Sequence, residues 1–130
     1  FGLLNIIYYI SILIIKTRYI MGAEVFYNRG KGTSASEVFK QEREHACYEN
    51  GHGGYTGTIA EKGGYTMSSK PKDIEADKWF EMIDELDIDD TSQEHYRALK
   101  KDYNTYDDKW GDALCIPTDD GFIFCGWASS

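Results

Sequence analysis

Hydrophobic positions change their period along the chain after residue 21, and each change predicts a new element. Residues 23–28 alternate between apolar and polar types and are rich in β-formers, which predicts a strand. Ser34 stands three residues before Glu37, the spacing of a capping box, so we expect a helix from Ser34 to about Asn50. Gly51 follows as a residue that can end this helix in a left-handed conformation. The side chains of this helix expected to face the core are Val38, Phe39, Ala46 and Cys47.

The middle of the chain predicts a hairpin and two further helices. Residues 55–62 alternate as a strand, the glycine pair at 63–64 predicts a turn, and 65–67 follows as the second arm. Residues 73–86 carry apolar side chains at three- and four-residue steps, which predicts a helix. A capping-box spacing at 91–94 starts another helix, ended by the glycine at 111. The apolar stripes are Ala76, Trp79, Phe80, Ile83 and Leu86 in the first of these helices, and Tyr96, Leu99, Tyr103, Tyr106 and Trp110 in the second.

The C-terminal residues predict a second hairpin. Its arms are 113–117 and 122–127, joined by the turn Asp119-Asp120-Gly121, in which Asp-Gly accepts the positive φ angles that a tight turn needs. Helices and strands cluster rather than alternate regularly. We therefore expect an α+β fold, with a small, mainly antiparallel sheet packed with about three helices.

Residues 1–20 differ in kind from the rest, and we expect one domain at 21–130. Residues 1–15 have no charge and are followed by Lys16 and Arg18, but fifteen helical residues span only about 22 Å, less than a bilayer core needs. Of the first 20 residues, 16 are types that codons of A and T alone can encode. The favoured interpretation is translated non-coding sequence upstream of Met21. A truncated membrane anchor and a genuine buried element are the alternatives.

Charge and composition exclude several classes of protein. The formal net charge is −8, which argues against a protein that coats nucleic acid or an anionic membrane. We expect no membrane contact unless residues 1–20 are native. Two prolines and three unpatterned cysteines exclude a Pro-rich linker and a disulfide scaffold. Cys115 and Cys125 fall on the two arms of the predicted C-terminal hairpin, where they could face each other as buried free thiols.

A glycine-rich segment at 51–58 is the first candidate site. Its backbone N–H groups could cradle a nucleotide or another anion, helped by hydroxyl side chains. The competing interpretation is a helix C-cap and a plain connection, because the glycines follow a helix C-terminus, where the dipole repels anions. The candidate ligand-binding residues are His45, His52, Gly53, Gly54, Tyr55, Thr56 and Thr58.

Metal-binding and catalytic patterns are weak. His45 and Glu49 are one helical turn apart, but neither H-x-x-x-H nor a C-x-x-C pair occurs. His45 and Cys47 point in different directions on one helix and cannot form a nucleophile–base pair. The sequence therefore predicts no metal, no cofactor and no catalytic residue.

An acidic run at 73–94 is the firmest functional clue, with ten acids against the single base Lys78. One interpretation is a solvated helix face, partly balanced by Arg97, Lys100 and Lys101 on the next helix. The other is a surface for a basic partner protein. The candidate partner-binding residues, centred on the helix expected at 73–90, are Glu81, Asp84, Glu85, Asp87, Asp89 and Asp90.

Two segments, residues 48–62 and 122–129, resemble small proteins of bacteriophage and prophage genomes. The resemblance implies a viral or mobile-element source and no activity, fold or site residue. We expect a small acidic binding protein in the host cytoplasm that engages a basic host protein and is not an enzyme. The alternative is a small-ligand-binding protein or enzyme that uses the glycine-rich segment.

Overall fold

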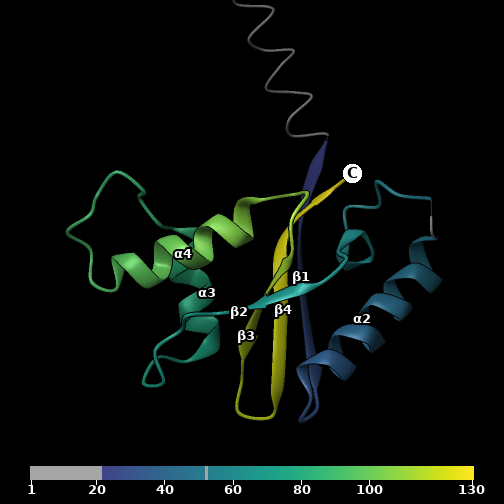
Figure 1. The fold of residues 1–130 in the computed structure, drawn as a ribbon, viewed down its shortest axis with the longest axis horizontal. Helices are drawn as coiled ribbons and strands as arrows, with labels where there is room; N and C mark the ends of the chain where they lie inside the picture. The colour runs from purple at the N-terminus through teal and green to yellow at the C-terminus, as the bar shows by residue number, and fades with distance from the viewer. Residues whose placement is uncertain (1–21, 52) are drawn as a thin grey trace, which may run out of the picture.

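The structure is a computed structural model that describes residues 22–51 and 53–130 of the 130-residue chain. The predicted leader at 1–20, with its three interpretations, and the candidate ligand residue His52 lie outside the described residues. The elements are β1 (Ala23–Lys31), α2 (Ala35–Asn50), the 3-10 helix η1 (Ile59–Glu61), β2 (Tyr65–Met67), α3 (Ala76–Asp84), α4 (Tyr96–Asp107), β3 (Ala113–Pro117) and β4 (Gly121–Ser129) (Figure 1).

The four strands of the described chain form one sheet in the order β1-β4-β3-β2. β1 pairs antiparallel with β4 along its whole length, from Ala23 opposite Ser129 to Lys31 opposite Gly121. β3 and β4 form the predicted C-terminal hairpin, whereas β2 runs parallel to β3. The sheet is therefore mixed but mainly antiparallel. Together with three α-helices in the described residues, it confirms the predicted α+β class.

Helices cover both faces of the sheet, so the described residues form three layers (Figure 1). On one face, α2 and η1 bury Val38, Phe39, Ala46 and Ile59 against Phe26, Ala113, Cys115, Phe124 and Ala128. On the other face, α3 and α4 bury Ala76, Trp79, Ile83, Leu99 and Tyr106 against Leu114, Ile116, Ile123 and Cys125. Both faces of β3 and β4 are thus covered, which explains why these strands are almost continuously apolar.

The two hairpin cysteines lie on opposite faces of the sheet, because successive side chains of a strand alternate in direction. Cys115 packs in the α2 core and Cys125 in the α3–α4 core, so the suggestion that they face each other is wrong. Both are buried free thiols, as predicted. Burial raises the pKa of the Cys115 thiol to about 12.

α2 begins and ends as its sequence predicts. The Ser34 hydroxyl accepts the N–H of Glu37 at 3.4 Å, and Gly51, with φ of 85°, donates its N–H to the Cys47 carbonyl at 2.8 Å. All four residues predicted to face inward are buried. The cap and the apolar spacing together decide this helix.

The predicted strand at 55–62 is wrong. Tyr55 and Gly57 take left-handed φ angles of 59° and 70°, which interrupt an extended strand, and Thr58 then caps η1 by accepting the N–H of Ala60 at 3.2 Å. β2 occurs where it was expected. It pairs with β3 instead of closing a hairpin through the glycine pair at 63–64.

The two helices of the other layer are shorter than predicted. α3 occupies the centre of the expected range 73–86, and the predicted residues Ala76, Trp79 and Ile83 are its buried ones. α4 starts at Tyr96 rather than at the capping-box spacing of 91–94, because side-chain to backbone hydrogen bonds fold the segment 87–93 into turns.

Candidate functional site

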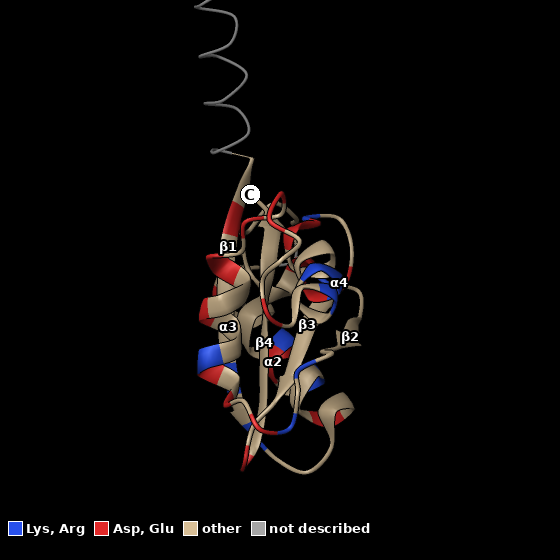
Figure 2. Cartoon of the chain, turned by 90° about the vertical axis from the view of Figure 1, so that its left-hand side faces the viewer, with Lys and Arg blue, Asp and Glu red and all other residues tan. Residues whose placement is uncertain are grey.

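Six carboxylates project from α3 and from the loop that follows it, and we call this set the acidic surface. They are Glu81, Asp84, Glu85, Asp87, Asp89 and Asp90, and all six are exposed. Figure 2 shows acidic residues along α3 and basic residues gathered on the neighbouring α4. The structure thus brings the predicted partner-binding residues together on one helix end and its loop.

The acidic surface is not neutralised by the fold. The ion pairs among the described residues are Arg29–Asp77, His45–Glu49 and His95–Glu94, and none of them includes a member of the acidic surface. The basic residues of α4 therefore form no ion pair with these six acids. These contacts give no support to direct pairing between the acidic surface and α4, and they are consistent with the competing interpretation of the acidic run as a solvated helix face.

The helix dipole makes the position of two of these acids unfavourable. Asp84 is the last residue of α3 and Glu85 is its C-cap, while the last turn contains no basic residue. The C-terminal end of a helix carries partial negative charge, so each acid there typically costs about 0.3–1 kcal/mol. Asp84 is partly compensated, because the Tyr106 hydroxyl donates to it at 3.2 Å. Burial and then the neighbouring Asp84 raise the pKa of Tyr106 above its ordinary value.

Hydrogen bonds hold two carboxylates of the loop after α3, those of Asp87 and Asp90, in place. Asp87 accepts the N–H of Asp89 at 3.0 Å, and Asp90 accepts the N–H of Ser92 at 3.1 Å. Gln93 donates to the carbonyl oxygens of Asp87 and Asp90 at 2.7 and 3.0 Å. The hydrogen bonds from Ser92 lower the pKa of Asp90 below its ordinary value.

An apolar side chain stands among these charges. Ile88 is 41% exposed and is flanked in sequence by Asp87 and Asp89. The Tyr96 hydroxyl donates to its carbonyl oxygen at 2.7 Å, which ties this part of the loop to α4. An apolar group ringed by charged groups is a common composition for the centre of a protein–protein contact.

A buried carboxylate fixes α3 beneath the acidic surface. Asp102 of α4 is only 2% exposed. It accepts the indole N–H of Trp79 at 2.8 Å, the backbone N–H of Ser69 at 2.9 Å and the Ser68 hydroxyl. One side chain therefore joins α3, α4 and the loop after β2, and this joint sets the direction in which α3 presents its acids.

The glycine-rich loop already holds an anion of its own, the side chain of Glu61. Its carboxylate accepts the backbone N–H groups of Tyr55 at 2.9 Å and Thr56 at 3.3 Å, and the Thr56 hydroxyl at 2.7 Å. Partial burial raises the pKa of Glu61, but these hydrogen bonds and the charge of Arg43 outweigh it, so the net pKa is lowered. An external anion would have to displace this carboxylate.

The other predicted ligand residues are only partly assembled. The hydroxyls of Thr56 and Thr58 lie 2.8 Å apart, so the structure brings these two together with Tyr55 around Glu61. His45 pairs with Glu49 on its own helix at 3.2 Å, and both side chains are mostly exposed. Gly53 and Gly54 are exposed members of the loop.

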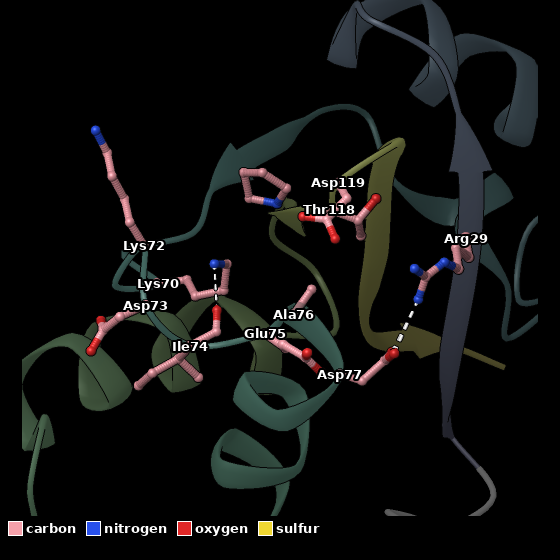
Figure 3. Close-up of a pocket in the computed structure, with 11 residues that line it drawn as sticks. Arg29, Lys70, Lys72, Asp73, Ile74, Glu75, Ala76, Asp77, Thr118 and Asp119 are labelled. Atoms are coloured by element: carbon pink, nitrogen blue, oxygen red, sulfur yellow. Dashed lines mark hydrogen bonds and ion pairs between the residues drawn. The ribbon is translucent and has the colours of Figure 1, made fainter.

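A cavity of about 230 Å³ lies between β1, the start of α3 and the β3–β4 turn (Figure 3). Two of its charged lining residues pair with each other, and a third contacts backbone carbonyl groups. Arg29 pairs with Asp77 at 3.1 Å, and Lys70 donates to the carbonyl oxygens of Pro71 at 3.1 Å and Ile74 at 2.6 Å. The Tyr27 hydroxyl also donates to Asp77 at 2.7 Å. The contacts of Tyr27 and Arg29 with Asp77 link β1 to α3.

Comparison of the chain with protein-family models, curated proteins and solved structures gave no match. Within residues 22–51 and 53–130, no helix is long and apolar enough to cross a bilayer. The same residues contain no group of three or more His, Cys, Asp or Glu side chains arranged to hold a metal ion.

Sequence reasoning missed three residues that organise these sites. Asp102 could have been found, because it stands three residues after Leu99 and four before Tyr106, on the buried side of α4. Glu61 carries no such signal, since its partners depend on the fold of the loop. Lys62 is also buried, and its ammonium group donates to the carbonyl oxygens of Asp108 and Gly111 at 3.0 and 3.1 Å.

Proposed function

We propose that this protein is a small acidic binding protein whose acidic surface recognises a basic surface on another protein. The observation that carries the proposal is the concentration of six exposed carboxylates on the end of α3 and the loop that follows it. They are exposed, they take part in none of the described ion pairs, and two of them stand where the dipole of α3 disfavours them. The cost of placing Asp84 and Glu85 at this helix end is only partly offset, by the Tyr106 hydroxyl, and this supports a role in binding.

The arrangement of the acidic surface supports a role in binding a protein over that of a solvated helix face. The turns of the 87–93 loop hold the carboxylates of Asp87 and Asp90 in place, so a basic partner would meet two charges that are already positioned. Ile88 supplies apolar area among them. Opposite charges speed the encounter of two proteins, and an apolar centre then slows their dissociation.

The resemblance of residues 48–62 and 122–129 to bacteriophage proteins supports a setting for this activity. We place the protein in the host cytoplasm as a phage accessory factor that engages a host protein. The alternative, an anion-binding loop at 51–58, is less favoured, because Glu61 already accepts two backbone N–H groups of that loop.

Charge reversal with a matched control tests the proposal. In one variant Asp84, Glu85, Asp87 and Asp89 are replaced by Lys, and in the control the exposed Glu24, Glu37, Glu44 and Glu49 are replaced by Lys. Both variants have the same net charge, so they differ only in where the acids are removed. Both are immobilised, and bacterial proteins retained from a lysate are quantified by mass spectrometry.

We expect a protein with a basic surface to be retained by the wild type and the control and lost from the first variant. Its retention should also weaken as salt is raised from 50 to 500 mM, a range over which screening of exposed charges increases strongly, with a Debye length of about 10 Å at 0.1 M. Equal retention by both variants, or equal loss from both, would refute recognition by the acidic surface.

A further inference from the structure

Two large aromatic side chains form an exposed pair at one end of the domain. Tyr55 in the glycine-rich loop is 67% exposed and Trp110 after α4 is 68% exposed. Their ring centroids lie 6.4 Å apart with the planes at 90°. The Lys109 ammonium group lies 5.2 Å from the centre of the Trp110 ring. We call Tyr55, Lys109 and Trp110 the aromatic patch.

The backbone holds both rings in solvent. Tyr55 has a φ of 59°, a left-handed value that is costly for a bulky residue, and its N–H is fixed by Glu61. The N–H of Trp110 is fixed by the Asp108 carboxylate at 3.0 Å. The hydrogen bond to Glu61 offsets part of the strain at Tyr55, but both rings remain exposed. A pair of large exposed aromatic side chains is typical of a surface that contacts another surface.

The aromatic patch adjoins the point where residues 1–21 join the domain. Lys109 donates to the carbonyl oxygen of Gly22 at 3.3 Å, so the same ammonium group contacts Gly22 and lies over Trp110. Ser130 also donates to this carbonyl, which places the C-terminus at the same end (Figure 1). Residues 1–15 are uncharged and strongly apolar, and Lys16 and Arg18 stand between them and Gly22.

We propose that this end of the protein rests on a lipid surface, with Trp110 and Tyr55 at the level of the headgroups. Trp, Tyr and Lys are the residues that favour this zone, because each combines an apolar body with a polar tip. The proposal takes residues 1–20 as part of the protein, the anchor interpretation of the leader. It is independent of the acidic surface.

The charges around the patch select the kind of lipid. Glu24, Asp108 and Asp112 are exposed nearby, and they repel anionic headgroups. A choline group is attracted both by these carboxylates and by the faces of the aromatic rings. The expected occupant is therefore a zwitterionic bilayer.

The test uses the full chain of 130 residues with phosphatidylcholine vesicles whose acyl chains are either plain or brominated. Bromine quenches only indoles that reach the bilayer. Trp79 is fully buried and Trp127 is half-buried, so a Trp110→Phe variant assigns the signal. We expect brominated vesicles to quench part of the wild-type emission, and this part to be missing in Trp110→Phe.

A second measurement compares vesicle affinities. Tyr55→Ser combined with Trp110→Ser should bind about tenfold more weakly than wild type, because two interfacial rings are lost. Met67→Ser on β2, which removes a 44% exposed apolar side chain elsewhere, should bind as wild type does. If the double variant fails to fold, as judged by circular dichroism, the quenching result alone decides.

Three results would overturn the proposal. One is the absence of binding to these vesicles, and another is binding through residues 1–20 without quenching of Trp110. The third is shielding of Trp110 from acrylamide before any vesicle is added, which would show that another segment or a retained peptide covers the patch.

Discussion

Two carboxylates, those of Asp102 and Glu61, each hold segments of the chain together by hydrogen bonds. Asp102 joins α3, α4 and the loop after β2 beneath the acidic surface, and Glu61 closes the glycine-rich loop beside the aromatic patch. Each accepts at least three hydrogen bonds, and hydrogen bonds to a charged acceptor are worth more than those between neutral groups. Their removal should therefore affect stability more than the removal of any exposed acid.

Asp102→Asn should destabilise the protein by about 2–3 kcal/mol, because an amide cannot accept from every donor that now faces Asp102. Urea unfolding followed by far-UV circular dichroism measures the change. Asp107→Asn, an exposed position on the same helix, serves as the control and should change stability little. Equal stabilities of the two variants would show that the buried network is unimportant.

Glu61 should make stability depend on pH at the acidic end of the range. Its pKa is lowered from the ordinary 4.5 in the folded state, so it contributes stability that is present above the ordinary pKa. This contribution is lost as the pH falls from about 4.5 through the lowered folded pKa. Urea midpoints of Glu61→Gln should thus fall less steeply below this pH than those of wild type. A parallel pH profile for the two proteins would contradict this role.

At the scale of single residues, the sequence allowed the charged groups and the helical spacing to be predicted. It did not allow the hydrogen-bond partners of those groups to be predicted. The spacing of α4 places Asp102 on its buried side, so that residue was predictable in principle. The carboxylate of Glu61 meets Tyr55 and Thr56 only because Tyr55 adopts a left-handed φ angle, which a tyrosine rarely does.

At the scale of elements, α3 ends with two acids that its own dipole disfavours. Its C-terminal end carries Asp84 and Glu85 where the dipole favours cations. Glu85→Lys should therefore raise the free energy of unfolding by about 0.3–1 kcal/mol, as measured by urea unfolding, while it weakens partner retention. Glu85→Gln should give an intermediate stability. A Lys variant that is less stable than wild type would show that this acid serves the fold.

Elements with complete local signals were predicted well, and elements without them were not. α2 has its cap at Ser34, its apolar stripe and its terminal glycine, and the β3–β4 hairpin has its Asp-Gly turn. The segment 55–62 alternates like a strand, yet glycine flexibility and the Thr58 cap made it a loop with η1. β2 found a parallel partner distant in sequence, which no local pattern encodes.

At the scale of the whole molecule, two surfaces of different chemistry lie in different parts of the domain. The acidic surface lies on the α3–α4 side, and the aromatic patch lies at the end of the domain where Gly22 and the C-terminus meet (Figures 1 and 2). A protein partner and a lipid surface could therefore be engaged at the same time. The two proposals fail or succeed separately, since the Lys variant of Asp84, Glu85, Asp87 and Asp89 leaves the aromatic patch unchanged and the Ser variant of Tyr55 and Trp110 leaves the acidic surface unchanged.

Native mass spectrometry of the protein after incubation in a bacterial lysate and gentle repurification tests the central claim most directly. The account predicts a stoichiometric protein partner that is absent when Asp84, Glu85, Asp87 and Asp89 are replaced by Lys. A retained small molecule of nucleotide or metal size, unaffected by that replacement, would contradict the account and return attention to the glycine-rich loop.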